Sequence, residues 1–151
     1  MVEKVDLESL LAMFEKLNET PGCCMLQVVQ KWNREVDGVF DELGTTRTQM
    51  DLLTALTKLT QDGKPVTQKD VADLVRRDQN TVSAVMRTLE KKGHITRSST
   101  EDDLRAKYIV LTDRGLSLVE QATGKILVMN QRFFPDADDN KELIRLSSKY
   151  C

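Results

Sequence analysis

Polar side chains that can make paired hydrogen bonds are concentrated between Gln79 and Arg87. At about 100° per residue, a helix over this stretch has two faces. One face is apolar, with Val82, Val85, Met86 and Leu89, and the other holds Gln79, Asn80, Ser83, Ala84 and Arg87. Asn and Gln can bond adenine through two hydrogen bonds, Arg can do the same with guanine, and small methyl groups suit the thymine methyl. The polar face therefore fits base edges in a DNA major groove, although an ordinary solvated helix face has a similar composition.

The sequence offers weaker candidates for a catalytic or metal-binding site than for a DNA-binding face. A hydrolase or transferase needs an activated nucleophile or an acid–base pair, and the single histidine, His94, follows a glycine with no cysteine near it in sequence. The acidic run Glu101–Asp103 alone is more typical of a solvated loop than of a metal site. We therefore expect no enzyme activity, no cofactor and no metal.

Length and composition limit the remaining classes. The chain has 151 residues, which suits one domain, or one domain with an oligomerisation arm. The longest apolar run has five residues, Leu10–Phe14, far below the ~20 needed to cross a bilayer. The acidic N-terminal stretch lacks the features of a secretory signal, and three cysteines, two of them adjacent, make no disulfide framework. We expect a cytoplasmic protein with no membrane partner.

The charge is unevenly distributed along the chain. Between Lys64 and Lys107 there are ten Lys or Arg and seven Asp or Glu, a net charge of +3, while the remainder has twelve and seventeen, a net charge of −5. A basic middle third on an acidic background is compatible with a nucleic-acid face. The cations nearest the polar face are Arg76, Arg77, Lys91 and Lys92.

Short, well-capped helices are predicted around the polar face. Thr46 is the predicted N-cap of a capping box, in which the Gln49 side chain bonds back to the cap residue. Residues 67–70 form a second capping box whose last residue, Asp70, is acidic. Asp78 is the predicted N-cap of the next helix, and Gly93 lies beyond its end. Two helices of about eight and fourteen residues joined by a three-residue turn match a helix-turn-helix.

A two-stranded hairpin is predicted directly after these helices. Residues 94–97 form a short strand, residues 98–106 a polar loop and residues 107–111 a second strand. This chain order is that of a winged helix. Thr112 then caps a long helix that is interrupted near Phe134-Pro135, and Asp138 or Asp139 starts a last short helix. The predicted fold class is mainly α with a minor β component, a winged helix-turn-helix with helical dimerisation arms at both chain ends.

The arms are predicted from apolar spacing. Residues 4–18 form one helix, and a second, from about Cys24 to Leu43, has apolar residues spaced alternately by four and three positions. That seam fits either a helix of the monomer core or a dimer helix. A further apolar stripe runs from Leu116 to Phe133. We expect a homodimer with dimerisation helices in 1–43 and 113–151 and a DNA-binding lobe in 44–112.

With these elements in this order, the chain resembles the MarR (multiple antibiotic resistance regulator) family of bacterial winged-helix transcription factors. The resemblance covers roughly 44–122 and rests on Thr46-x-x-Gln49, Val66-Thr67-x-x-Asp70-Val71-Ala72, Thr81-Val82-Ser83, Leu89-Glu90-Lys91-Lys92-Gly93, Ile95-Thr96-Arg97, Asp103-Leu104-Arg105 and Leu111-Thr112-Asp113-Arg114-Gly115. It implies a regulator, most simply a repressor, that binds a pseudo-palindromic operator in double-stranded DNA as a homodimer.

The DNA contacts that follow fall into three groups. The recognition helix supplies Gln79, Asn80, Thr81, Ser83, Ala84 and Arg87, phosphate contacts come from Lys69 and Lys91, and the wing supplies Arg105 and Lys107. The wing departs from the family pattern, which usually has a basic residue at the position of Leu104. Arg105 either enters a narrow minor groove or pairs with Asp103 or Glu101.

Control of the regulator has two candidate routes. Some members of the resembled family sense oxidants through a cysteine near the helix that precedes the DNA-binding lobe, and Cys23 and Cys24 stand at such a helix start, where a thiolate is favoured. Cysteine is also a common small core residue. The more general family behaviour is release by a small aromatic or lipophilic ligand, for which Met13, Trp32, Phe40 and Met50 are either cavity or core residues.

A winged-helix module used only for protein contacts is the remaining alternative. Such a module does not require the polar face or its flanking cations.

Overall fold

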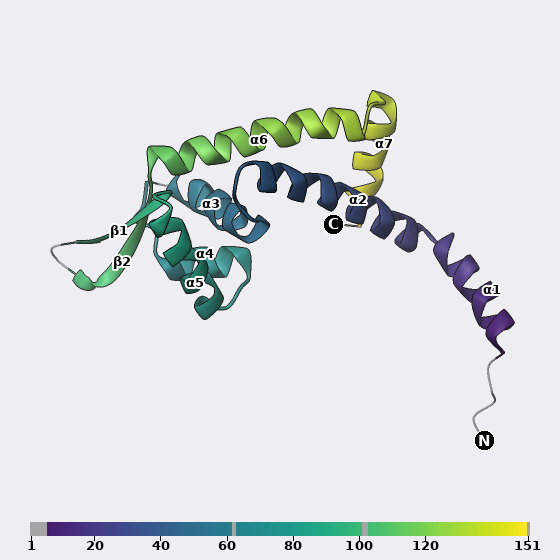
Figure 1. Ribbon diagram of the computed structural model, residues 1–151, viewed down its shortest axis with the longest axis horizontal. Coiled ribbons are helices and arrows are strands. Elements are labelled where there is room, and N and C mark those ends of the chain that lie inside the picture. Colours follow the sequence, from purple (N-terminus) through teal and green to yellow (C-terminus); the bar gives the residue numbers. More distant parts are fainter. Residues whose placement is uncertain (1–5, 62, 101–102, 151) are drawn as a thin grey trace, which may run out of the picture. The chain divides into compact units, whose positions relative to one another are not determined.

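The computed structural model describes residues 6–61, 63–100 and 103–150 and is mostly helical (Figure 1). The chain divides into two compact units, Met1–Val36 and Asp37–Cys151, which are described separately.

The first unit holds α1 (Leu7–Asn18) and most of α2 (Pro21–Glu42). Asp6 caps α1 by accepting a hydrogen bond from the Ser9 backbone N–H. Helix α2 starts three residues earlier than predicted, because proline is tolerated in the first helical turn, where its missing N–H costs no bond. Both helices leave large apolar side chains at least 42% exposed, namely Leu7, Leu11, Met13, Phe14, Leu17, Met25, Leu26, Val28 and Val29.

The core of the second unit is a group of three helices, α3 (Arg47–Thr60), α4 (Gln68–Val75) and α5 (Gln79–Lys91). The side chains with no exposed surface come from all three, namely Leu52, Leu53, Leu56, Val71, Val82, Met86 and Leu89. Ala72 is only 2% exposed at the contact between α4 and its neighbours, where its small side chain allows a close approach. The predicted helix-turn-helix is confirmed, with helices of eight and thirteen residues.

The helix caps largely agree with the sequence. Thr67 and Asp70 form the complete capping box, and Asp78 and Thr112 cap α5 and α6 (Asp113–Phe133). The prediction for Gln49 was wrong in one respect: Thr46 accepts from the Gln49 N–H, but the Gln49 side chain is buried and accepts hydrogen bonds from Thr45 and Lys92. Those more distant partners compete with the cap and could not be inferred from local spacing.

The wing is longer than predicted. Strands β1 (Ile95–Thr100) and β2 (Asp103–Leu111) pair antiparallel from Ile95–Leu111 outward, with an irregularity between Ser99 and Thr100. Residues 98–100 and 103–106, predicted as loop, are therefore strand, because antiparallel pairing joins backbone groups and does not need apolar side chains. The hairpin is anchored at its base by the Ile109 N–H, which donates to the Val66 carbonyl at 2.8 Å.

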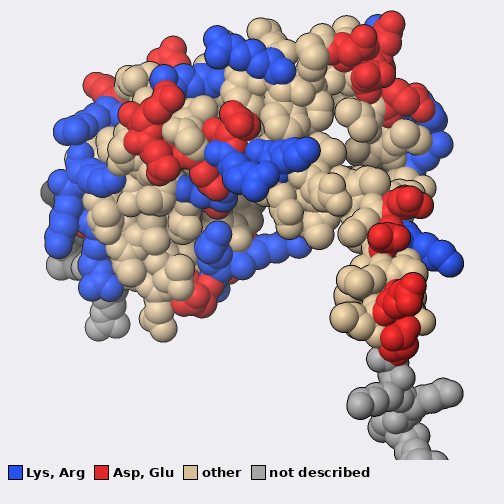
Figure 2. All heavy atoms as spheres, turned by 45° about the vertical axis from the view of Figure 1, so that its right-hand side comes forward, with Lys and Arg blue, Asp and Glu red and all other residues tan. Residues whose placement is uncertain are grey.

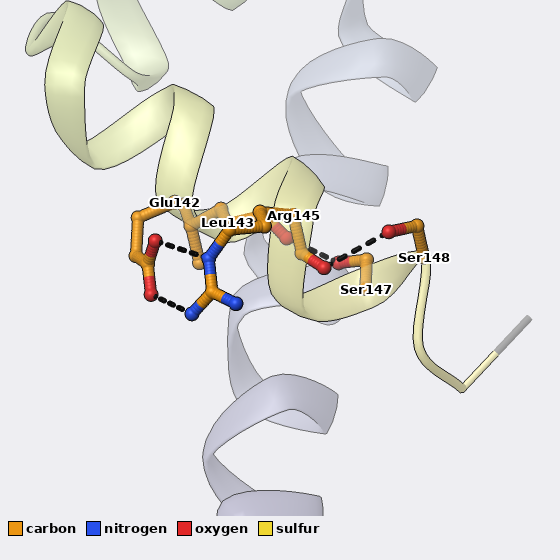
Figure 3. A network of polar contacts seen from close by, with 5 residues as sticks. All are labelled: Glu142, Leu143, Arg145, Ser147 and Ser148. Carbon is orange, nitrogen blue, oxygen red and sulfur yellow. Dashed lines mark hydrogen bonds and ion pairs between the residues drawn. The ribbon is translucent and has the colours of Figure 1, made fainter.

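Helix α6 begins beside the hairpin and runs away from it to α7 (Ala137–Ser147) (Figure 1). Asp136 caps α7, two residues before the predicted start, because its carboxylate accepts from both the Asp138 and Asp139 N–H groups. The last turns of α7 carry the Glu142–Arg145 ion pair and two serine-to-carbonyl hydrogen bonds (Figure 3). Every helix in the described ranges is too short or too polar to span a bilayer.

Candidate nucleic-acid interface

The turn between α4 and α5 fixes how the recognition helix is presented. Arg76 adopts a left-handed conformation, with φ 52°, and the Arg77 N–H donates to the Ala72 carbonyl at 3.1 Å. These contacts close α4 with the bonding pattern of a Schellman motif. The Gln68 side chain then donates to the Gln79 carbonyl at 3.3 Å, which ties the first residues of the two helices together. Gln68 was not among the predicted site residues, since a glutamine at a helix start gives no signal for a contact eleven residues away.

Helix α5 has the two faces expected from its sequence. Val82, Met86 and Leu89 are fully buried, and Val85 is half-buried rather than buried. On the opposite face Gln79, Asn80, Ala84 and Arg87 are exposed and Ser83 is half-buried. Packing of the apolar face thus fixes the helix rotation that presents the polar face to solvent.

Two of the predicted contact residues already have partners in the protein. The Thr81 hydroxyl donates to the Asp78 carboxylate at 2.6 Å, and this bond, with the Thr81 N–H, lowers the pKa of Asp78 below its ordinary value. The Thr81 hydroxyl is therefore part of the cap, and its methyl group is the part suited to a base contact. The Arg87 Nε donates to the Ser83 carbonyl at 3.3 Å, so the guanidinium is held along the helix surface.

The basic side chains around α5 fall into different roles. Lys69 and Lys91 are exposed, as phosphate contacts require. Arg77 lies 3.6 Å from an Asp51 carboxylate oxygen. Lys92 was expected among the flanking cations, but its Nζ donates to two oxygens of the protein, at Gly44 and Gln49. In Figure 2, Lys and Arg side chains gather along the left edge of the molecule.

The wing contributes one contact that was not predicted. Arg97 in β1 lies 3.2 Å from a carboxylate oxygen of Glu90 in α5, and its side chain is only 19% exposed. This ion pair joins the base of the wing to the recognition helix. Arg105 and Lys107 lie in β2, but their side chains fall outside the described part of the structure, as do Glu101 and Asp102.

The candidate regulatory residues lie in both units. Cys23 is half-buried and Cys24 is exposed in the first turn of α2, with the Cys24 Sγ 3.6 Å from the Asn18 carbonyl. Cys151 lies outside the described residues. Phe40 and Met50 are buried core side chains, Met13 is exposed and Trp32 is half-buried. Among the described residues, no three His, Cys, Asp or Glu side chains are grouped as a metal site would need.

Comparison with known proteins identifies similar chains. The sequence model of the MarR family matches residues 46–107. The chain is 36% identical over 124 residues to YdcH of Bacillus subtilis, an HTH-type transcriptional regulator, covering 82% of this chain and 84% of the relative.

Solved structures show the same similarity. MepR of Staphylococcus aureus, a transcription regulator of the multidrug efflux pump MepA, matches with a TM-score of 0.76 and 27% identity over 87% of this chain and 96% of MepR. MepR in a complex with DNA matches with a TM-score of 0.65 and 28% identity over 87% of this chain and 94% of that chain. YusO of Bacillus subtilis, at 18% identity and a TM-score of 0.72 over 97% of both chains, shares the fold.

Proposed function

Because the chain belongs to the MarR family, we propose that it is a transcriptional regulator that binds a specific double-stranded DNA site through α5. The observation that carries this proposal is the polar face of α5, which is held outward by three fully buried residues on the opposite face. Side chains there offer amide, hydroxyl, guanidinium and methyl groups, which together can distinguish base pairs in the major groove. The DNA complex of MepR, which is 28% identical to this chain, supports the same use of the fold.

The DNA contacts divide by chemistry. Base contacts come from Gln79, Asn80, Ser83, Ala84 and Arg87, and from the methyl group of Thr81. Lys69 and Lys91 contact phosphates, which supplies affinity without sequence preference. Arg105 and Lys107 of the wing complete the contact set.

We further propose that the regulator acts as a homodimer on a pseudo-palindromic operator. Helices in 1–43 and 113–151 serve as the dimerisation arms and 44–112 as the DNA-binding lobe. Large apolar side chains of α1, α2, α6 and α7 are exposed in the single chain, and apolar surface of this extent marks an interaction site. In the second unit, a hollow of about 710 Å³ between the end of α6 and α7 is lined by Leu127, Leu143 and Ile144 among others. A two-fold dimer places two recognition helices about 34–36 Å apart, one turn of DNA.

Binding over a promoter blocks transcription, so repression is the proposed direction of control. A small ligand is the proposed release signal. A hollow of about 480 Å³ is lined by Thr57 and Thr60 at the end of α3 and by apolar side chains of β2 and the α6 start, including Tyr108, Val110 and Leu116. Its size suits a small molecule.

Oxidant control through Cys23 or Cys24 is the second candidate, favoured by their place in the first turn of α2 and the exposure of Cys24. Operator binding after peroxide treatment of the wild type, Cys23→Ser, Cys24→Ser and Cys151→Ser distinguishes the two routes. A peroxide response that disappears in Cys23→Ser or Cys24→Ser supports this route, and an unchanged wild type excludes it.

Selection of duplexes from a randomised library tests the main proposal. Wild-type protein should enrich a two-fold symmetric sequence, and its binding should weaken as salt increases. Recovery of unrelated sequences with no salt-sensitive retention would instead favour a winged-helix module for protein contacts.

A further inference from the structure

Lys92, the C-cap residue of α5, makes its polar contacts within the protein. Its Nζ donates to the Gly44 carbonyl at 2.8 Å and to the Gln49 Oε1 at 3.1 Å. Gln49 is 9% exposed, and the Thr45 hydroxyl donates to the same Oε1 at 3.2 Å. Two hydrogen bonds from an ammonium group to oxygens of the protein are stronger than neutral ones. A phosphate contact by Lys92 would require both to break.

The backbone on both sides of this contact is fixed. Helix α5 ends with Gly93 at φ +75° and a hydrogen bond from the His94 N–H to the Leu89 carbonyl. Helix α2 ends in the same way, with Gly44 at φ +65° and a bond from the Thr45 N–H to the Phe40 carbonyl. Both are Schellman motifs, which hold the last turn of a helix. Lys92 therefore joins two rigid helix ends that are 48 residues apart in sequence.

The α2 end of this contact is itself tied to other helices of the second unit. Asp37 pairs with Arg47 of α3 at 2.8 Å, and Glu42 pairs with Lys125 of α6 at 2.8 Å. These pairs are largely exposed and each contributes little alone. The contacts of Lys92 reach the end of the recognition helix, and the one to Gln49 is part-buried while the one to Gly44 is exposed.

We propose that Lys92 is a positioning residue for DNA recognition, which holds α5 at a fixed orientation to the α2–α3 turn without touching DNA. This inference rests on the proposed function. The buried face sets the rotation of α5, and without the Lys92 contact the end of the helix is held less firmly against the α2–α3 turn. The apparent affinity then falls by the fraction of the free protein that is competent to bind. Neighbouring Lys91 is exposed, so the adjacent pair Lys91–Lys92 combines one DNA contact and one internal contact.

The test compares Lys92→Met with its neighbour Lys91→Met on the duplex that the wild type selects from a random library. Lys92→Met should bind the duplex about tenfold more weakly, because it loses hydrogen bonds made by a charged group. The dependence of its affinity on salt should remain that of the wild type. Lys91→Met should bind more weakly and lose about one unit of salt slope per phosphate contact. Affinities are corrected for the active fraction by stoichiometric titration, because loss of folded protein alone would leave the corrected affinity unchanged.

A double-mutant cycle with Gln49→Leu separates the outcomes further. If both residues act through one contact, the double variant should bind no more weakly than Lys92→Met alone. An unchanged corrected affinity in Lys92→Met, or a salt slope reduced as in Lys91→Met, would overturn the inference. A wild type that selects no sequence would instead refute the proposed function itself.

Discussion

Gly115 lies against the carbonyl of His94 so closely that a Cβ on residue 115 would stand 2.1 Å from the His94 oxygen. The contact joins the first turn of α6 to the segment between α5 and β1. Thr112 strengthens the same junction, since its hydroxyl donates to the Gly93 carbonyl at 2.7 Å and its N–H to the His94 carbonyl. The end of the recognition helix, the base of the wing and the start of α6 therefore meet at one point.

Gly115→Ala should destabilise the protein by about 1–3 kcal/mol, because the added methyl group overlaps backbone that must shift. Gly124→Ala is the matched control in the same helix, where an added Cβ meets no atom within 4 Å. That variant should gain up to about 1 kcal/mol from helix propensity. Urea unfolding at one protein concentration measures both, and equal stability of the two variants would contradict the contact.

His94 should make stability depend on pH near neutrality. Burial, followed by the charges of Arg114 and Lys92, lowers the pKa of His94 from its ordinary value, and its buried Nδ1 has no hydrogen-bond partner among the described residues. The unfolded chain therefore binds the proton more readily. The stability contributed by neutral His94 is present above the unfolded pKa of about 6.5 and is lost as pH falls through that value toward the folded pKa.

The thermal midpoint of the wild type should therefore decrease as the pH is lowered from about 7.5 to about 5.5. Ordinary carboxylates titrate below this range. His94→Leu, which cannot titrate, should flatten this part of the profile. Parallel profiles for the two proteins would assign the effect to another group.

Arg76→Gly should stabilise the helix-turn-helix by about 1 kcal/mol, because a residue with a Cβ is strained in the left-handed region. Arg77→Gly is the control, since Arg77 has an ordinary negative φ and an ion pair with Asp51. It should lose stability. Urea unfolding that shows a loss of the same size in both variants would show that the turn at Arg76 is not strained.

Much of this architecture follows from local sequence signals. Caps at Thr67, Asp78 and Thr112 and the glycines at 44 and 93 could be predicted because their partners lie within a few residues. The apolar face of α5 was likewise predictable from a 3.6-residue period, except at Val85, whose burial depends on neighbouring helices.

The less predictable features are contacts between distant residues. Lys92 was counted with the surface cations because two adjacent lysines after a helix are usually solvated, and its partners lie more than 40 residues earlier. The Arg97–Glu90 pair and the Gln68–Gln79 bond are of the same kind. Strand residues 98–100 and 103–106 were missed because their polar side chains resemble a loop.

Dimerisation should appear as a mass twice that of the 17.2 kDa chain in light scattering at micromolar concentration. Ile144 on α7 is 70% exposed in the single chain, and Ile144→Glu should shift the protein toward the monomer by burying a charge in the interface. Lys141→Glu, another charge change at an exposed position of α7, is the control. A monomeric wild type would contradict the role proposed for the arms.

The affinity ratio between the selected duplex and a shuffled duplex, measured for the wild type and Arg87→Ala, tests the central claim most directly. If the polar face of α5 contacts bases, Arg87→Ala should lose about 1–3 kcal/mol per site on the selected duplex and little on the shuffled one, so that the ratio falls. Lys69→Ala and Lys91→Ala should weaken both duplexes alike and keep the ratio. An equal loss on both duplexes for Arg87→Ala would show that this face of α5 does not recognise sequence.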